Sequence, residues 1–300
     1  MEVPLTTDYV LTSEMPADLT REHYEKRSVP VIPFHFFLDE KEYIEDFGVT
    51  VPFDAFYKKI AAGAMTRTSQ PNISEYFAFF TPVLEQGKDI VHLSLSSGIS
   101  GAYNSARNAA EILAERFPDR KLYVIDSLAA SSGQGLLVDW AADQRDAGLT
   151  AAELASWVEE NRLKVHHWFF TTDLSTFVRG GRVSKAAGVF GGLLDICPLL
   201  NVDPKGCLTA REKVRTKKRV IRETVKKMEQ FAADGKAYGG KCYISQSACY
   251  EDARAVADLI EETFPKLKGK VEINWVGNLI GSHTGPGTVA LFFCSSEPRT

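Results

Sequence analysis

Short apolar runs alternate with longer amphipathic stretches in the first half of the chain, and this alternation restricts the possible folds more than any other feature. Short apolar runs are typical of buried strands, and amphipathic stretches between them are typical of helices that cover a sheet. The pattern predicts parallel β–α units with helices on both faces of the sheet. The segments concerned are Tyr9–Leu11, Arg21–Arg27, Val29–Leu38, Phe53–Ala62, Ile90–Leu95, Ala102–Phe117, Leu122–Ile125 and Leu136–Ala147.

The pattern changes near residue 164. Two strand-like runs, Leu199–Val202 and Leu208–Val214, are joined by the turn-forming Asp203-Pro204-Lys205-Gly206. Helical and strand-like segments then interleave, which favours a mixed or antiparallel sheet. We therefore expect an α/β protein of two domains: a Rossmann-like parallel sheet with helices on both faces over residues 1–163, and a mixed or antiparallel sheet with helices over residues 164–300. A ligand would lie between them.

Composition excludes several classes of function. A net charge of −4 and a pI near 5.9 argue against general nucleic-acid binding. No apolar run approaches the roughly 20 residues that span a bilayer, and the first residues lack the layout of a signal peptide, so we expect a cytoplasmic protein without a transmembrane segment. The five cysteines show no C-x-x-C spacing. We expect neither a metal site nor a cofactor.

The junction Ser94–Ser105 joins the strand-like Ile90–Leu95 to a helical run. A helix N-terminus carries unpaired N–H groups and a partial positive charge, and Gly98 and Gly101 would let a ligand approach the backbone. The segment lacks the lysine of a P-loop and the pattern of a nucleophile elbow. The segment predicts a binding site for a small oxyanion, without indicating which one. Alternatively, its residues only form the turn and cap the helix.

Three further loops carry hydroxyl groups, glycines or a histidine. Pro71 favours an extended Gln70, so Thr66–Pro71 is expected to be a fixed loop that presents hydroxyls, or else the N-cap of a helix at Ser69 or Ser74. Asp126 and Ser127 are interpreted as caps of the following helix. His283 lies in the glycine-rich Gly281–Thr288 and either contacts a bound group or forms a structural hydrogen bond; His166 and His167 are interpreted as strand residues.

A basic stretch runs from Arg211 to Lys227, with nine basic and two acidic residues in 17 positions. Such a stretch is either a solvated face or a docking site for an acidic partner. The candidate docking residues are Arg211, Lys213, Arg215, Lys217, Lys218 and Arg219.

Motifs for catalysis are missing from the sequence. It contains no fingerprint of a kinase or dehydrogenase and no cluster of metal ligands. A site that offers oxyanion donors without an acid, base or nucleophile is suited to binding a ligand rather than to catalysis. We therefore expect that this protein is not an enzyme. The alternative is an enzyme that acts on a small phosphorylated or carboxylated metabolite, with His283 as its acid or base.

Six motifs occur in one order along nearly the whole chain, and together they resemble the DegV family. They are Thr68-Ser-Gln-Pro71, Ser94-Leu-Ser-Ser-Gly-Ile-Ser-Gly-Ala-Tyr103, Asp126-Ser127, Arg179-Gly-Gly-Arg-Val183, Glu212-Lys-Val-Arg215 and His283-Thr-Gly-Pro-Gly287. The resemblance implies a two-domain α/β protein that binds a long-chain fatty acid between its domains. In one branch of the family, the protein presents the acyl carboxylate to a separate, dihydroxyacetone-kinase-like fatty acid kinase, which forms the acyl phosphate.

The resemblance also implies roles for particular residues. Thr68 and Ser97, with Ser96, would hold the carboxylate, and His283, through water, and Arg182 would lie nearby. The acyl tail, worth about 0.8 kcal/mol per buried methylene, would dominate the affinity. Val189–Leu194 and Ile196 are candidates for the tunnel wall, or else ordinary core residues.

The chain departs from the family at its first motif. Members usually open with a strand followed by Thr-Asp-Ser, whereas this chain has Thr12-Ser13-Glu14. The exchange is expected to change the charge beside the mouth of the pocket.

Overall fold

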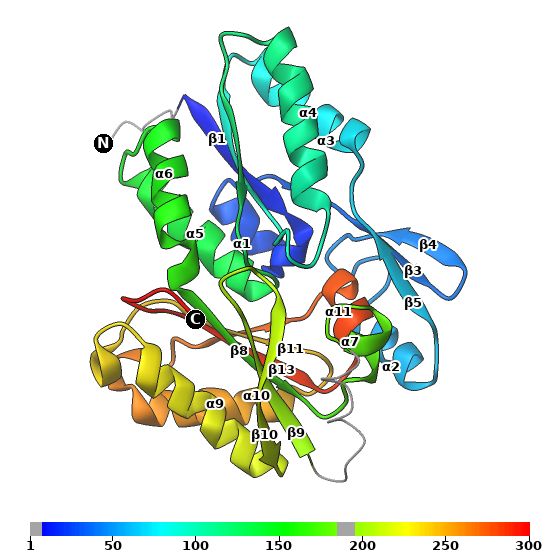
Figure 1. The fold of residues 1–300 in the computed structure, drawn as a ribbon, viewed down its shortest axis with the longest axis vertical. Helices are drawn as coiled ribbons and strands as arrows, with labels where there is room; N and C mark the ends of the chain where they lie inside the picture. Colours follow the sequence, from blue (N-terminus) through cyan, green and yellow to red (C-terminus); the bar gives the residue numbers. More distant parts are fainter. Residues whose placement is uncertain (1–7, 185–195) are drawn as a thin grey trace.

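The computed structural model describes residues 8–184 and 196–300, which form two α/β halves around a shared interior (Figure 1). Within its described residues, the N-terminal half contains seven strands in two sheets. Its strands are β1 (Tyr9–Glu14), β2 (Val31–Ile32), β3 (His35–Leu38), β4 (Lys41–Ile44), β5 (Thr66–Ser69), β6 (Asp89–Ser94) and β7 (Leu122–Asp126). Its helices are η1 (Met15–Ala17), α1 (Arg21–Lys26), α2 (Phe53–Ala61), α3 (Ile73–Glu85), α4 (Ala102–Arg116), α5 (Ser132–Asp146) and α6 (Ala151–Asn161).

The first sheet is parallel, with strand order β2-β1-β6-β7. Its central strand β6 is buried on both faces, as expected of a parallel sheet covered by helices. Ile90 packs with α3 and α4, whereas Val91 and Leu93 pack with α5 and α6 on the opposite face. The predicted parallel sheet with helices on both faces is confirmed.

The run Val29–Leu38 is not one strand, as its apolar sequence predicted. It contains Pro33, which lacks the N–H that a ladder needs, and the chain leaves the parallel sheet after β2. β3 pairs instead with β4 and β5 in a separate antiparallel sheet of order β4-β3-β5. Thr66–Ser69 is therefore an edge strand rather than a loop, and the following helix α3 is capped by Asn72 rather than by Ser69 or Ser74.

The C-terminal half is built on a six-stranded mixed sheet of order β10-β9-β8-β13-β11-β12. Its strands are β8 (Val165–Thr171), β9 (Ile196–Val202), β10 (Leu208–Arg215), β11 (Cys242–Gln246), β12 (Glu272–Trp275) and β13 (Thr288–Cys294). Its helices are η2 (Arg162–Lys164), α7 (Ser175–Arg179), α9 (Lys217–Phe231), η3 (Gly235–Ala237), α10 (Tyr250–Thr263), η4 (Pro265–Leu267) and α11 (Asn278–Thr284). Pairing is antiparallel except between β11 and β12, which confirms the predicted mixed sheet and the hairpin at residues 203–206.

The two faces of this sheet pack into two different hydrophobic cores. Along β8, Trp168 and Phe170 point to α9 and α10, and Phe169 points to the N-terminal half. This alternation follows from the two-residue period of a strand. We propose a domain boundary between residues 163 and 164, because β8 is the first strand of the six-stranded sheet along the chain.

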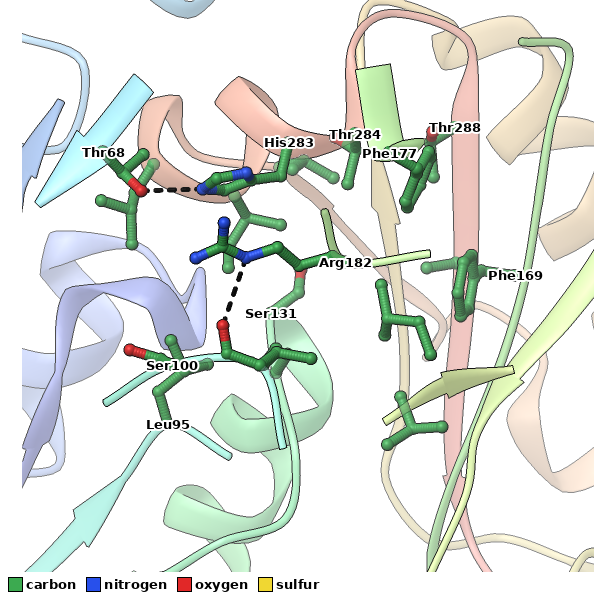
Figure 2. A pocket seen from close by; sticks show the side chains of 18 of the residues that line it. Thr68, Leu95, Ser100, Ser131, Phe169, Phe177, Arg182, His283, Thr284 and Thr288 are labelled. Atoms are coloured by element: carbon green, nitrogen blue, oxygen red, sulfur yellow. Dashed lines mark hydrogen bonds between the residues drawn. The ribbon is translucent and has the colours of Figure 1, made fainter. Parts of the chain in front are cut away.

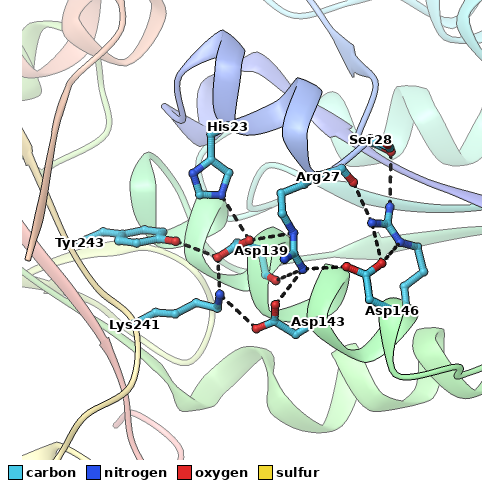
Figure 3. Close-up of polar contacts among 9 residues, drawn as sticks. His23, Arg27, Ser28, Asp139, Asp143, Asp146, Lys241 and Tyr243 are labelled. Atoms are coloured by element: carbon cyan, nitrogen blue, oxygen red, sulfur yellow. Dashed lines mark hydrogen bonds and ion pairs between the residues drawn. The ribbon is translucent and has the colours of Figure 1, made fainter. Parts of the chain in front are cut away.

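An ion cluster joins the two halves beside β11 (Figure 3). The carboxylate of Asp139 on α5 contacts His23 Nε2 at 3.2 Å, Arg27 Nε at 3.1 Å and Lys241 Nζ, and it accepts a hydrogen bond from the hydroxyl of Tyr243 at 2.8 Å. These cation and hydroxyl contacts hold the pKa of Asp139 well below its ordinary value despite burial of the side chain. The cluster fixes β11 against α1 and α5, and its Tyr243 lies on the interior face of the sheet, opposite Phe292 in the register.

Candidate functional site

A cavity of about 320 Å³ lies between the two halves, within the range of about 300–1,000 Å³ found for small-molecule sites. Its floor is the inner face of the six-stranded sheet. Register places the floor side chains in successive rows: first Thr288, then Ala290 opposite Phe169, then Phe292 opposite His167. The opposite wall comes from the N-terminal half and from α11, with Phe34, Leu95, Ala130, Leu279 and Ile280. Most of this surface is apolar.

Polar side chains gather at the end of the cavity nearest α7 and α11 (Figure 2). Thr68 projects from β5, His283 from α11, and Arg182 from the segment after α7. Thr68 Oγ1 lies 2.7 Å from His283 Nε2. Ser69 belongs to the same lining and is exposed, so the cavity reaches the protein surface at this end.

The environment of His283 keeps its imidazole neutral near pH 7. Burial and, as a smaller contribution, the positive charge of Arg182 together lower its pKa from 6.5 to about 4. Nδ1 has no hydrogen-bond partner among the described residues and lies against Gly180, where a Cβ atom would come within 2.5 Å of it. When Nε2 carries the proton and donates it to Thr68 Oγ1, the Thr68 hydroxyl proton is free to donate to an anion in the cavity.

Arg182 closes the polar end from the other side. Its Nε donates to the carbonyl oxygen of Ile99 at 3.2 Å and its Nη1 to that of Gly180 at 2.6 Å, so the guanidinium bridges the two halves. Burial lowers the pKa of Arg182 from its ordinary value. Because the ordinary pKa of arginine is so high, the side chain is still positively charged at neutral pH. A carboxylate placed beside this guanidinium would be stabilised by its charge.

Ser96 and Ser97 are not part of the cavity lining, and the reason is the contact that their loop makes. Ser96 is fully buried, and its hydroxyl donates to the carbonyl oxygen of Gly206 at 2.8 Å, at the tip of the β9–β10 hairpin. Ser97 is exposed, with its N–H donating to Asp126 Oδ1. Ser100, at the other end of the loop, does line the cavity. Carboxylate binding by Ser96 and Ser97 stays a prediction that this placement does not favour.

Asp126 and Ser127 do not cap α5. Asp126 Oδ1 accepts from the N–H groups of Ser97 and Leu128, which fixes the loop, and the helix begins later, at Ser132. The residue before it, Ser131, has φ 53° and ψ −152°, a strained conformation for a residue with a side chain. Its hydroxyl donates to Asp18 Oδ2 at 2.5 Å, and its side chain lines the cavity.

The acid gained at Glu14 does not lie at the mouth of the cavity, contrary to the expectation from sequence. Its carboxylate is fully buried at the end of β1 and accepts hydrogen bonds from Tyr76 Oη, Ser94 Oγ and the N–H of Leu95, at 2.5, 2.7 and 2.6 Å. Leu95 lines the cavity. Glu14 therefore fixes the backbone of Leu95, whose side chain forms part of the cavity wall.

The basic stretch lies along the edge strand β10 and the start of α9. Leu208 lines the cavity, and Arg215 follows seven residues later, roughly 23 Å along an extended strand. Lys217 forms an ion pair with Asp252 at 2.8 Å. None of the six basic candidates belongs to the described cavity lining, but the register places Arg215 opposite Ile196, level with the end of β8 that leads to α7.

The proposed tunnel-wall residues 189–194 lie outside the described residues, and Ile196 is not in the cavity lining. Sequence reasoning missed most of the wall that the structure shows. Phe169 and Phe292 could have been found from the alternation along β8 and β13. Phe34, Leu279 and Ile280 depend on tertiary contacts that no local pattern predicts.

Comparison with known proteins decides the family. The model of the DegV family matches residues 14–296. This chain belongs to the DegV family. A DegV domain-containing protein of Clostridium perfringens is 35% identical over 285 residues, which cover 95% of this chain and 97% of that protein.

Solved structures of DegV proteins have the same two-part fold. A fatty-acid-binding DegV family protein from Thermus thermophilus matches with a TM-score of 0.83 and 25% identity, over 96% of this chain and 99% of that one. DegV from Bacillus subtilis, also a fatty acid binding protein, matches with a TM-score of 0.81 and 25% identity, over 97% and 100%. Within residues 8–184 and 196–300 of this DegV chain, no helix combines the length and the apolarity needed to cross a bilayer.

Proposed function

We propose that this protein binds a long-chain fatty acid, with the carboxylate at Thr68, His283 and Arg182 and the tail along the inner face of the six-stranded sheet. The observation that carries the proposal is the polarity of one cavity: a cation and hydroxyl groups lie at its surface end, and apolar side chains lie along its length. The fatty acid binding named for the Thermus and Bacillus relatives supports the same ligand class.

The two parts of the cavity would contribute differently. Each methylene of the tail that leaves water contributes about 0.8 kcal/mol, so a tail of typical length outweighs any single polar contact. The polar end fixes the orientation of the ligand, because an arginine and a free hydroxyl proton both favour a carboxylate over a methyl group. The tail would set the affinity, and the polar end would direct the carboxylate toward the surface near Ser69.

We further propose that the bound carboxylate is presented to a separate fatty acid kinase, the role that resemblance to one branch of the DegV family implies. The position of the polar end supports this role, since it adjoins the exposed Ser69 while the tail is enclosed. The basic residues Arg211, Lys213, Arg215, Lys217, Lys218 and Arg219 are the proposed docking surface for an acidic face of that kinase.

Native mass spectrometry of the full chain purified from cells tests ligand binding directly. The expected result is a protein ion with the added mass of one fatty acid, which organic extraction then identifies. Titration of the delipidated protein with the same acid and with the alcohol of equal chain length tests the polar end: the acid should bind more tightly. Equal affinities would show that the carboxylate is not recognised, and a chain that binds neither compound would remove the proposal.

The alternative, an enzyme acting on a small anionic metabolite, has less support in this geometry. A neutral His283 with a pKa of about 4 is a poor proton donor at neutral pH. A small anion would also leave the apolar walls around Phe169 and Phe292 in contact with water.

A further inference from the structure

The deepest row of the cavity floor contains His167 between apolar neighbours. Leu208 pairs with Val202, and His167 pairs with Phe292; all four side chains line the cavity. Val202 continues the row of His167 because Trp168 pairs with Asn201. Val165 and Cys294, the next residues on this face of β8 and β13, are not part of the lining. The described cavity floor ends at this row.

The row lies at the opposite end from the polar side chains. Thr171 is the last residue of β8 before the connection to α7, and Thr288 is the first residue of β13 after α11. Arg182 follows α7 and His283 belongs to α11, so both come from the segments that join this end of the sheet. His167 lies four positions before Thr171 on β8, roughly 13 Å away at 3.3 Å per residue. A fatty acid with its carboxylate at Arg182 and its tail along the cavity floor would extend toward His167.

The imidazole of His167 is held in one position. Its Nδ1 lies 3.0 Å from the carbonyl oxygen of Val165, and because a carbonyl only accepts, Nδ1 carries the proton. The ring meets Phe292 edge-on, with 5.3 Å between centroids, and it lies against Gly133 of α5, where a Cβ atom would collide with it. The side chain is 2% exposed. A ring fixed on three sides acts as a wall rather than as a movable gate.

The ring also lacks the features that would make it a second head-group site. Burial lowers its pKa well below the ordinary value, so it is uncharged at neutral pH. Its Nε2 has no hydrogen-bond partner among the described residues, so contact with a methyl group would break no existing hydrogen bond. An apolar chain end therefore meets an uncharged, fixed ring.

We propose that His167 is a specificity-determining residue that limits the length of the acyl chain, because its ring forms the wall that the terminal methyl group reaches. This inference rests on the proposed fatty-acid site. The neighbouring His166 provides a matched control, since it lies on the same strand and is 3% exposed but faces the other side of the sheet, where its ring stacks on Phe293.

The test is titration of the delipidated full chain with lauric, palmitic, stearic and arachidic acid. For the unchanged protein, affinity is expected to rise with chain length up to a limit and then to fall. His167→Ala should move that limit to a longer acid, with a gain of roughly four-fold in affinity for each further methylene that becomes buried. His167→Phe, which restores a ring of similar size, should keep the original limit. His166→Ala should also keep it.

An unchanged limit in His167→Ala would overturn the inference, and so would the same shift in His166→Ala. If His167→Ala does not fold, the unchanged protein still gives an answer. With palmitic acid labelled with ¹³C at its terminal methyl, an NOE to the ring protons of His167 is expected, and its absence would contradict the proposed wall. Binding of none of the four acids would instead remove the proposed function itself.

Discussion

Thr68 Oγ1 and His283 Nε2 lie 2.7 Å apart, and this hydrogen bond joins the edge strand of a small N-terminal sheet to a helix of the C-terminal half. Two residues earlier on the same strand, Thr66 donates to the carbonyl oxygen of Ser282, the neighbour of His283. Both threonines join β5 to α11, but only Thr68 lines the cavity. Substitution of Thr68 and of Thr66 can therefore distinguish an effect on ligand binding from an effect on the contact between β5 and α11.

Thr68→Val is expected to weaken fatty-acid binding by about 1–3 kcal/mol, because a charged acceptor loses a hydroxyl donor. Isothermal titration of delipidated protein measures the loss. Thr66→Val removes a similar link between β5 and α11 and should leave the affinity within error of the unchanged protein. Equal losses in both variants would mean that Thr68 acts only through the position of α11.

Ser100→Ala is expected to weaken fatty-acid binding, whereas Ser97→Ala should have little effect. Ser100 lines the cavity, and the exposed Ser97 does not. The Ser100 hydroxyl also accepts from the N–H of Ala102 at the start of α4, so the melting temperature must be measured alongside the affinity. A loss confined to Ser97→Ala would restore the assignment made from the family motif.

His283 makes folding stability depend on pH. Its pKa is about 4 in the folded chain and 6.5 as the ordinary value, so the unfolded chain binds the proton more readily. The stability from the neutral ring is complete above pH 6.5 and is lost as the pH falls toward 4, with a loss of about 2 kcal/mol at pH 5. Urea unfolding of the ligand-free protein and of His283→Gln between pH 8 and pH 5 should show a shallower decline for the variant. Parallel declines would contradict the lowered pKa.

Asp139→Asn is expected to destabilise the protein by about 3–5 kcal/mol, because Lys241, Arg27 and His23 would be left around a neutral side chain. Asp139 is 4% exposed, whereas Asp258 is 69% exposed in a surface ion pair with Arg254. Asp258→Asn should therefore cost less than about 1 kcal/mol. Denaturant unfolding compares the two variants, and similar midpoints would show that the interdomain cluster adds no more than a surface pair.

Reversal of Arg215 and Lys218 to glutamate should slow association with a fatty acid kinase and reduce its salt dependence, because charges at the rim of an interface act mainly on the association rate. Lys217 is unsuitable for this test because its ion pair with Asp252 would also be broken. Surface plasmon resonance at two salt concentrations gives the rate, with bound lipid checked by mass spectrometry. Unchanged association would leave the basic stretch as a solvated face.

The sequence by itself determined the architecture, because local periodicity carries that information. Alternation of apolar runs with amphipathic stretches predicted the parallel sheet, and the turn at residues 203–206 predicted the hairpin of the mixed sheet. The order of six motifs predicted the family. The same argument from local pattern gave a wrong prediction at Val29–Leu38. The apolar run resembles one strand, but Pro33 divides it between two sheets.

Only the tertiary structure decided which polar groups meet. Thr68, Arg182 and His283 come from distant parts of the chain, and their convergence depends on the packing of β5, α7 and α11 against one another. Ser96 and Ser100 occupy one short loop, yet Ser96 donates to Gly206 while Ser100 reaches the cavity. A sequence motif shows that a loop has donors, but the acceptor of each hydroxyl comes from a distant segment: Gly206 of the other half for Ser96, and Gln70 of the same half for Ser100.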